Sequence, residues 1–93
     1  MSSQAKRLVV HGRVQGVGFR YFVQHAATRL GLTGDVRNCP DSTVEIVVAG
    51  NARKIVEFIE LVEKGPSHAR VQRVDVTDMP VQGTYSSFTI EGW

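Results

Sequence analysis

The sequence predicts an α+β sandwich of the ferredoxin-like type, in which split β-α-β units place two helices on one face of an antiparallel sheet. Two segments repeat apolar residues at helical spacing, and the segments around them alternate apolar with polar residues as strands do. The order of these segments is β-α-β-β-α-β, which is that of the split β-α-β arrangement. No linker or low-complexity stretch divides the 93 residues. We therefore expect a single domain over residues 1–93.

The first strand and the first helix occupy the first third of the chain. Residues 1–5 are predicted to fray. Residues 6–14 form a strand with one apolar face, made by Leu8, Val10, Gly12 and Val14. Apolar residues then recur at helical spacing from Phe19 to Leu30, and Gly31 follows as a C-terminal stop.

The middle of the chain is predicted to form a hairpin followed by the second helix. Residues 33–38 and 43–49 are strands on either side of a turn at Pro40-Asp41. Asn51 is a good N-cap for the helix that follows, and Gly65-Pro66 ends it.

One strand completes the predicted β-α-β-β-α-β order, and one further strand follows it. In residues 69–77 the apolar parity shifts between Val71 and Val74, which indicates a β-bulge. Residues 85–91 form the last strand, with Phe88 and Ile90 on one face.

Composition limits the class of partner. The chain has 11 basic and 9 acidic residues, a net charge of +2, spread along its length. This balance mildly favours small anionic substrates, and the lack of a basic stripe argues against a nucleic-acid partner. There is no apolar run long enough to span a membrane. Cys39 is the single cysteine, so no internal disulfide can form, and we expect a cytoplasmic protein. We also expect a monomer.

The most informative segment runs from Val14 to Arg20, between the first strand and the first helix. Gly16 and Gly18 allow a tight turn that leaves backbone N–H groups free to point in one direction. The helix N-terminus adds further unpaired N–H groups, and Arg20 adds a planar set of donors that suits phosphate oxygens. The segment predicts a phosphate site. The alternative is an ordinary tight turn with Arg20 as a solvated surface charge.

Two common phosphate motifs are excluded. A Walker A loop needs a Gly-Lys pair, and none follows Gly16 or Gly18. A dinucleotide fingerprint needs a third glycine where this chain has Tyr21.

Two stretches together resemble the acylphosphatase family, whose signatures read V-x-G-x-V-Q-G-V-x-F-R and G-x-V-R-N. This chain has VHGRVQGVGFR at residues 10–20 and GDVRN at residues 34–38. The resemblance extends from about Leu8 to Ile90 and implies a ferredoxin-like fold. It also implies metal-independent hydrolysis of small acyl phosphates to a carboxylate and inorganic phosphate, which acts as product and inhibitor, with no cofactor.

The resemblance assigns a role to each residue that matches a signature. Arg20 would hold the phosphoryl group together with the backbone N–H groups of a substrate-binding loop formed by Gln15, Gly16, Val17, Gly18, Phe19 and Arg20. Asn38 would orient the attacking water. An amide cannot act as a general base at neutral pH, so the proton acceptor would be the substrate phosphate or solvent.

Asp35 departs from the family pattern, which often has a large aromatic residue at this position. Two interpretations remain open: an exposed strand residue that faces water, or a residue at the mouth of the pocket that disfavours anionic acyl groups. Arg37 is expected to be a surface charge beside the site. The alternative to the enzyme is a non-catalytic anion-binding regulatory module on the same fold, since similar domains occur inside larger hydrogenase-maturation proteins.

Overall fold

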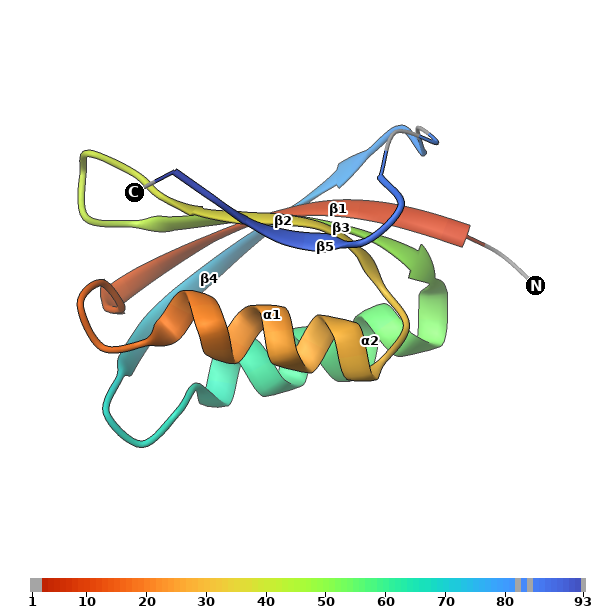
Figure 1. Ribbon diagram of the computed structural model, residues 1–93. Coiled ribbons are helices and arrows are strands. Elements are labelled where there is room, and N and C mark those ends of the chain that lie inside the picture. Colours follow the sequence, from red (N-terminus) through yellow and green to blue (C-terminus); the bar gives the residue numbers. More distant parts are fainter. Residues whose placement is uncertain (1–2, 82, 84, 93) are drawn as a thin grey trace.

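The structure of the protein, a computed structural model, describes residues 3–81, 83 and 85–92. Its elements follow one another along the chain as β1 (Ser3–Arg13), α1 (Phe19–Arg29), β2 (Thr33–Asn38), β3 (Val44–Asn51), α2 (Ala52–Lys64), β4 (Arg70–Met79) and β5 (Phe88–Glu91). The strands form one sheet in the order β4-β1-β3-β2-β5, and both helices lie under the same face of it (Figure 1). The predicted α+β sandwich is confirmed.

The sheet is mixed, which corrects the prediction of an antiparallel one. Strands β4, β1, β3 and β2 do pair antiparallel, but β5 pairs with β2 in parallel. Within the antiparallel part, β4-β1-β3-β2, the strand direction alternates. The outer strands of this part, β4 and β2, therefore run in opposite directions. The chain reverses once after β4 and joins the far edge, so β5 runs the same way as β2. The alternation of apolar and polar residues along β5 does not indicate which strand β5 pairs with or in which direction.

The element boundaries differ from the prediction at both ends of the chain. β1 begins at Ser3, where residues 3–5 pair with residues 49–51 of β3. The expectation that residues 1–5 fray is therefore wrong for residues 3–5, because backbone pairing holds them, and residues 1–2 lie outside the described residues. β5 begins at Phe88, three residues later than predicted.

The core lies between the sheet and the two helices. It contains the alternating residues of the strands and the apolar stripes of both helices; the largest fully buried side chains include Leu8, Phe19, Val36, Ile46 and Phe58. The predicted N-cap is confirmed, since Asn51 Oδ1 accepts from the backbone N–H groups of Arg53 at 2.9 Å and Lys54 at 3.2 Å. Among the described residues, no helix is long and apolar enough to cross a membrane.

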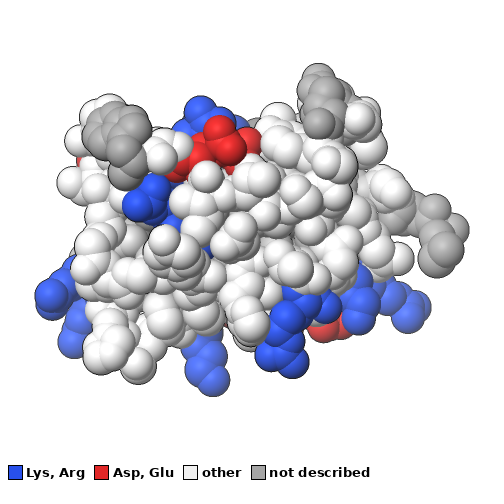
Figure 2. Space-filling view, in the orientation of Figure 1, with Lys and Arg blue, Asp and Glu red and all other residues white. Residues whose placement is uncertain are grey.

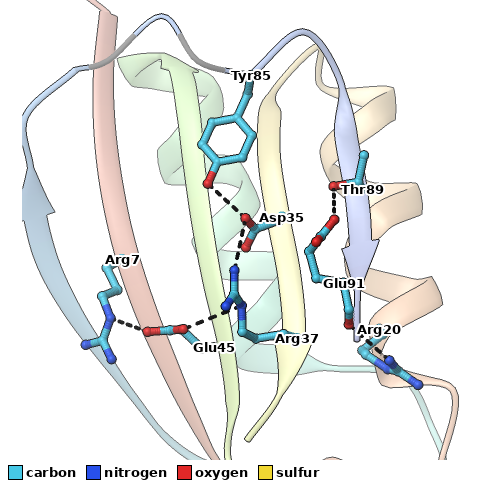
Figure 3. Close-up of polar contacts among 8 residues, drawn as sticks. All are labelled: Arg7, Arg20, Asp35, Arg37, Glu45, Tyr85, Thr89 and Glu91. Atoms are coloured by element: carbon cyan, nitrogen blue, oxygen red, sulfur yellow. Dashed lines mark hydrogen bonds and ion pairs between the residues drawn. The ribbon is translucent and has the colours of Figure 1, made fainter. Parts of the chain in front are cut away.

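The face of the sheet opposite the helices carries a polar network that includes Asp35. Asp35 is only 4% exposed, and the hydroxyl of Tyr85 donates to its Oδ2 at 2.8 Å. Arg37 connects Asp35 to Glu45, and Glu45 also pairs with Arg7 (Figure 3). Figure 2 shows acidic side chains with Lys or Arg beside them above the sheet.

Both interpretations of Asp35 from the sequence are therefore wrong. The carboxylate does not face water, and Asp35 does not line the pocket described below. The physical reason is a contact across 50 residues, in which Tyr85 covers the carboxylate and supplies a donor. Arg37 is partly exposed on the same face, so the expected surface charge is confirmed.

Replacing Tyr85 by Phe should lower the free energy of unfolding by about 1 kcal/mol at neutral pH, because the buried carboxylate of Asp35 loses the shorter of its two hydrogen bonds while the phenol itself is partly exposed. The hydrogen bond to Asp35, followed by burial, raises the pKa of Tyr85. A raised pKa means that the protonated phenol stabilises the fold below its ordinary pKa, near 10, and that this stabilisation is lost as the pH rises through the raised value. Chemical denaturation from pH 7 to 11 should show the difference between wild type and variant shrinking above about pH 10.

The matched control for this measurement is Tyr21→Phe. Tyr21 is 72% exposed, and its hydroxyl makes no hydrogen bond within the part of the chain that the structure describes. A Tyr85→Phe variant no less stable than Tyr21→Phe would contradict the role given to the Tyr85 hydroxyl.

Candidate active site

The connection between β1 and α1 is a short loop built on two glycines. Gly16 has a φ of 74° and Gly18 a φ of 75°, in the left-handed region that other residues rarely adopt. Gly18 is also the N-cap of α1, with no side chain to cap the helix. Across the described residues, no backbone N–H of residues 15–20 donates to a backbone or side-chain acceptor of the protein. The loop therefore offers a set of donors next to the positive end of a helix dipole.

The side chain of Gln15 fixes this loop to the neighbouring hairpin. Its Nε2 donates to two backbone carbonyls of the β2–β3 connection, those of Cys39 and Thr43, each at 2.9 Å. The sequence predicts Gln15 only as a member of the substrate-binding loop. The structure shows that the amide side chain is used for positioning, which leaves the backbone N–H as the group available to a ligand.

A pocket of about 110 Å³ lies at the start of α1, lined by Val14, Gly16, Gly18, Phe19, Arg20, Tyr21 and Asn38. It brings together Arg20, from the first turn of α1, and Asn38, the last residue of β2. Asn38 Oδ1 is buried and has no hydrogen-bond partner among the described residues. A buried acceptor without a partner is costly, so this oxygen is suited to bind a group that enters the pocket.

Arg20 is oriented by the last strand. Its Nη1 donates to the backbone carbonyl of Glu91 at 3.3 Å (Figure 3). One turn further along α1, the side chain of Gln24 donates to the carbonyl of Phe88 at 3.1 Å. A guanidinium has five N–H donors, so the bond to Glu91 leaves most of them free for a ligand.

The predicted site residues do not all lie in this pocket. Gly16, Gly18, Phe19, Arg20 and Asn38 line it, whereas Gln15 and Val17 do not. Val17 instead lines a larger hollow on the other side of Gly16.

Sequence reasoning missed two contributors to the pocket and one to the position of Arg20. Val14 and Tyr21 line the pocket, and the carbonyl of Glu91 holds Arg20. Tyr21 could have been found, because it is a large aromatic residue on the polar side of the helix directly after Arg20. The contact with Glu91 left no signal in the sequence, since it is made by a backbone atom 71 residues away.

No group of three or more His, Cys, Asp or Glu side chains among the described residues is arranged to hold a metal ion.

Comparisons with known proteins agree closely with this geometry. A family model described as acylphosphatase matches residues 6–90. An acylphosphatase of Koribacter versatilis is 45% identical over 91 residues, which are 98% of this chain and 83% of that protein. An acylphosphatase of Caldivirga maquilingensis is 46% identical over 85 residues, covering 90% of each chain.

Solved structures give the same result. The crystal structure of acylphosphatase from Bacillus subtilis superposes with a TM-score of 0.92 at 38% identity, covering 96% of this chain and 99% of that one. Full-length HypF in its phosphate- and nucleotide-bound form gives a TM-score of 0.90 at 35% identity, and covers 98% of this chain but only 12% of that chain. Because the family model and the relatives span nearly the whole sequence, this chain belongs to the acylphosphatase family.

Proposed function

We propose that this protein is an acylphosphatase that hydrolyses small acyl phosphates to a carboxylate and inorganic phosphate, without a metal ion or other cofactor. One observation carries the proposal: Arg20 and Asn38 line the same small pocket, beside a loop whose N–H groups have no acceptor in the described part of the protein. Family membership supports it independently.

The phosphoryl group would be held by charge and by preorganised donors. The backbone N–H groups of residues 15–20 and the guanidinium of Arg20 supply the hydrogen bonds to its oxygens. These donors are fixed before substrate arrives, by the glycine turn, by Gln15 and by the carbonyl of Glu91. Preorganised donors cost no reorganisation when negative charge develops in the transition state.

Asn38 would position the attacking water. Its buried Oδ1 accepts a hydrogen bond from that water, which attacks phosphorus as the bond from phosphorus to the acyl oxygen breaks. The leaving carboxylate is a weak base and needs no proton. The proton of the water passes to the phosphate or to solvent, because an amide cannot accept it.

The proposal includes the setting in which the enzyme works. A single domain acts as a monomer in the cytoplasm, and inorganic phosphate inhibits it by occupying the same loop. The lack of a second cysteine supports a reducing compartment. Light scattering at assay concentration tests the monomer directly.

The experiment that tests the function is hydrolysis of benzoyl phosphate by the purified protein in the presence of EDTA, followed by release of inorganic phosphate. We expect turnover that EDTA does not reduce and that added inorganic phosphate inhibits competitively. If the protein binds phosphate but turns over no acyl phosphate, it is a non-catalytic anion-binding module. If EDTA removes the activity and a divalent cation restores it, the metal-independent mechanism is wrong.

A further inference from the structure

A second hollow adjoins the catalytic pocket and shares Gly16 with it. Its volume is about 650 Å³, and its walls come from the end of β1, the 15–18 loop and the start of β4; the lining residues are Arg13, Gly16, Val17, Ser67, His68, Ala69 and Arg70. The catalytic pocket, at about 110 Å³, is much smaller than this hollow, and in the proposed mechanism it holds the phosphoryl group. The adjoining hollow has room for an acyl group that extends out of that pocket.

The hollow is basic. Arg13 and Arg70 both line it, and neither forms an ion pair within the described part of the chain, whereas Lys6, Arg7, Arg37 and Arg73 on the same sheet all do. Lys and Arg side chains project from the lower left of the molecule in Figure 2, the side on which Figure 1 places the loops before α1 and after α2. Like charges that face each other across paired strands destabilise a sheet unless an anion lies between them.

The β-bulge predicted from the sequence is what places the two arginines opposite each other. His11 pairs with Arg73, but the next residue, Gly12, pairs with Val71, so Gln72 is the extra residue. In an unbroken register Arg13 would face Val71. With the bulge it faces Arg70, and partners in a register point to the same side of a sheet. Bulges next to active sites commonly redirect a side chain in this way.

We propose that this hollow binds a second anionic group on the acyl part of the substrate, so that the enzyme favours acyl phosphates with two negatively charged ends. This inference rests on the proposed function and names the substrate class of that site. The phosphoryl group occupies the catalytic pocket, the acyl part crosses Gly16, and its distal carboxylate or phosphate lies between Arg13 and Arg70. The planar guanidinium donors suit either anion.

The test compares two substrates that differ in one charge, 4-carboxybenzoyl phosphate and the isosteric 4-carbamoylbenzoyl phosphate. The wild type should show a higher kcat/KM for the carboxylated compound at low salt. Arg13→Gln and Arg70→Gln should each lower the ratio of the two kcat/KM values about two- to fivefold, since both arginines are exposed to solvent. Both variants should retain the wild-type kcat/KM for the uncharged compound within about twofold.

Arg53→Gln is the matched control. Arg53 is exposed in the first turn of α2, and its replacement changes the net charge by the same amount. The ratio should stay at the wild-type value in this variant. A ratio that falls equally in Arg53→Gln would show an effect of net charge alone and would overturn the proposal.

A binding measurement separates failure of this inference from failure of the proposed function. The probes are 4-carboxybenzylphosphonate and benzylphosphonate, which cannot be hydrolysed, and binding is followed by amide chemical shifts of residues 13–20 and 67–71. Turnover with no preference for the carboxylated substrate and probe overturns the anionic subsite and leaves the acylphosphatase activity. No turnover, with tighter binding of the carboxylated probe that Arg70→Gln abolishes, overturns the activity and leaves the subsite.

Discussion

Replacing Arg20 by Gln should lower kcat/KM for benzoyl phosphate by about 10³-fold, with the fold intact. Arg20 lines the pocket at the start of α1, and the carbonyl of Glu91 engages its Nη1, so the remaining guanidinium donors are free for the phosphoryl group in the proposed mechanism. Gln keeps a polar side chain but removes the charge and the planar donor set. The inhibition constant of inorganic phosphate should rise about tenfold or more, because a hydrogen bond between charged groups is worth about 1.5–3 kcal/mol.

Steady-state kinetics and phosphate inhibition check this prediction together. Arg29→Gln provides the control, since Arg29 is exposed in the last turn of the same helix and carries the same charge. Arg20→Lys should fall between wild type and Arg20→Gln, because it keeps the charge without the bidentate geometry. A folded Arg20→Gln enzyme within tenfold of the wild-type kcat/KM would show that another group holds the phosphoryl oxygens.

The four-stranded part of the fold could be predicted because each element carries its own local signal. Leu8 and Val10 are spaced two residues apart on the buried face of β1, Asn51 caps a helix, and the parity shift in β4 marks its bulge. The pairing of β5 could not be predicted, because four residues of strand pattern fit either edge of a sheet and either direction.

In the candidate site, the residues could be predicted from the sequence, but the contacts that position them could not. Gly16, Gly18, Arg20 and Asn38 lie in two short stretches whose residues match the two family signatures. The contacts that fix them are long-range and use backbone atoms: Gln15 donates to carbonyls of the next hairpin, and Arg20 to a carbonyl of the last strand. A carbonyl is present at every residue, so no side-chain pattern identifies which one will be used.

Gly34 shows how one signature residue can serve the fold and not the ligand. A Cβ at this position would lie 1.8 Å from the backbone oxygen of Val47 on the neighbouring strand, so no larger residue fits without moving the backbone. The first residue of the second signature is therefore explained by strand packing, while the last, Asn38, is in the pocket.

Replacing Asn38 by Ala should lower kcat for benzoyl phosphate by about 10²–10³-fold while KM and the inhibition constant of phosphate change little. The reason for the split is that Asn38 contacts the water and not the phosphoryl group in the proposed mechanism, so its loss affects the transition state alone. Cys39→Ala is the control at the adjacent position, where the hydrogen bonds are made by backbone atoms, including the carbonyl that accepts from Gln15. An equal loss in KM and phosphate binding would mean that Asn38 holds phosphate and that the water is positioned by another group.

The same substitution should leave the free energy of unfolding unchanged or raise it, by up to about 1 kcal/mol in chemical denaturation. Asn38 Oδ1 is buried with no partner in the described residues, and removing an unsatisfied buried acceptor relieves a desolvation cost. A core or hairpin residue with a structural role would behave in the opposite way, losing stability on truncation to Ala. A variant that loses activity without losing stability therefore separates a group kept for catalysis from one kept for the fold. If Asn38→Ala instead unfolds at clearly lower denaturant than Cys39→Ala, the side chain supports the β2–β3 hairpin, and the loss of activity would follow from a displaced loop.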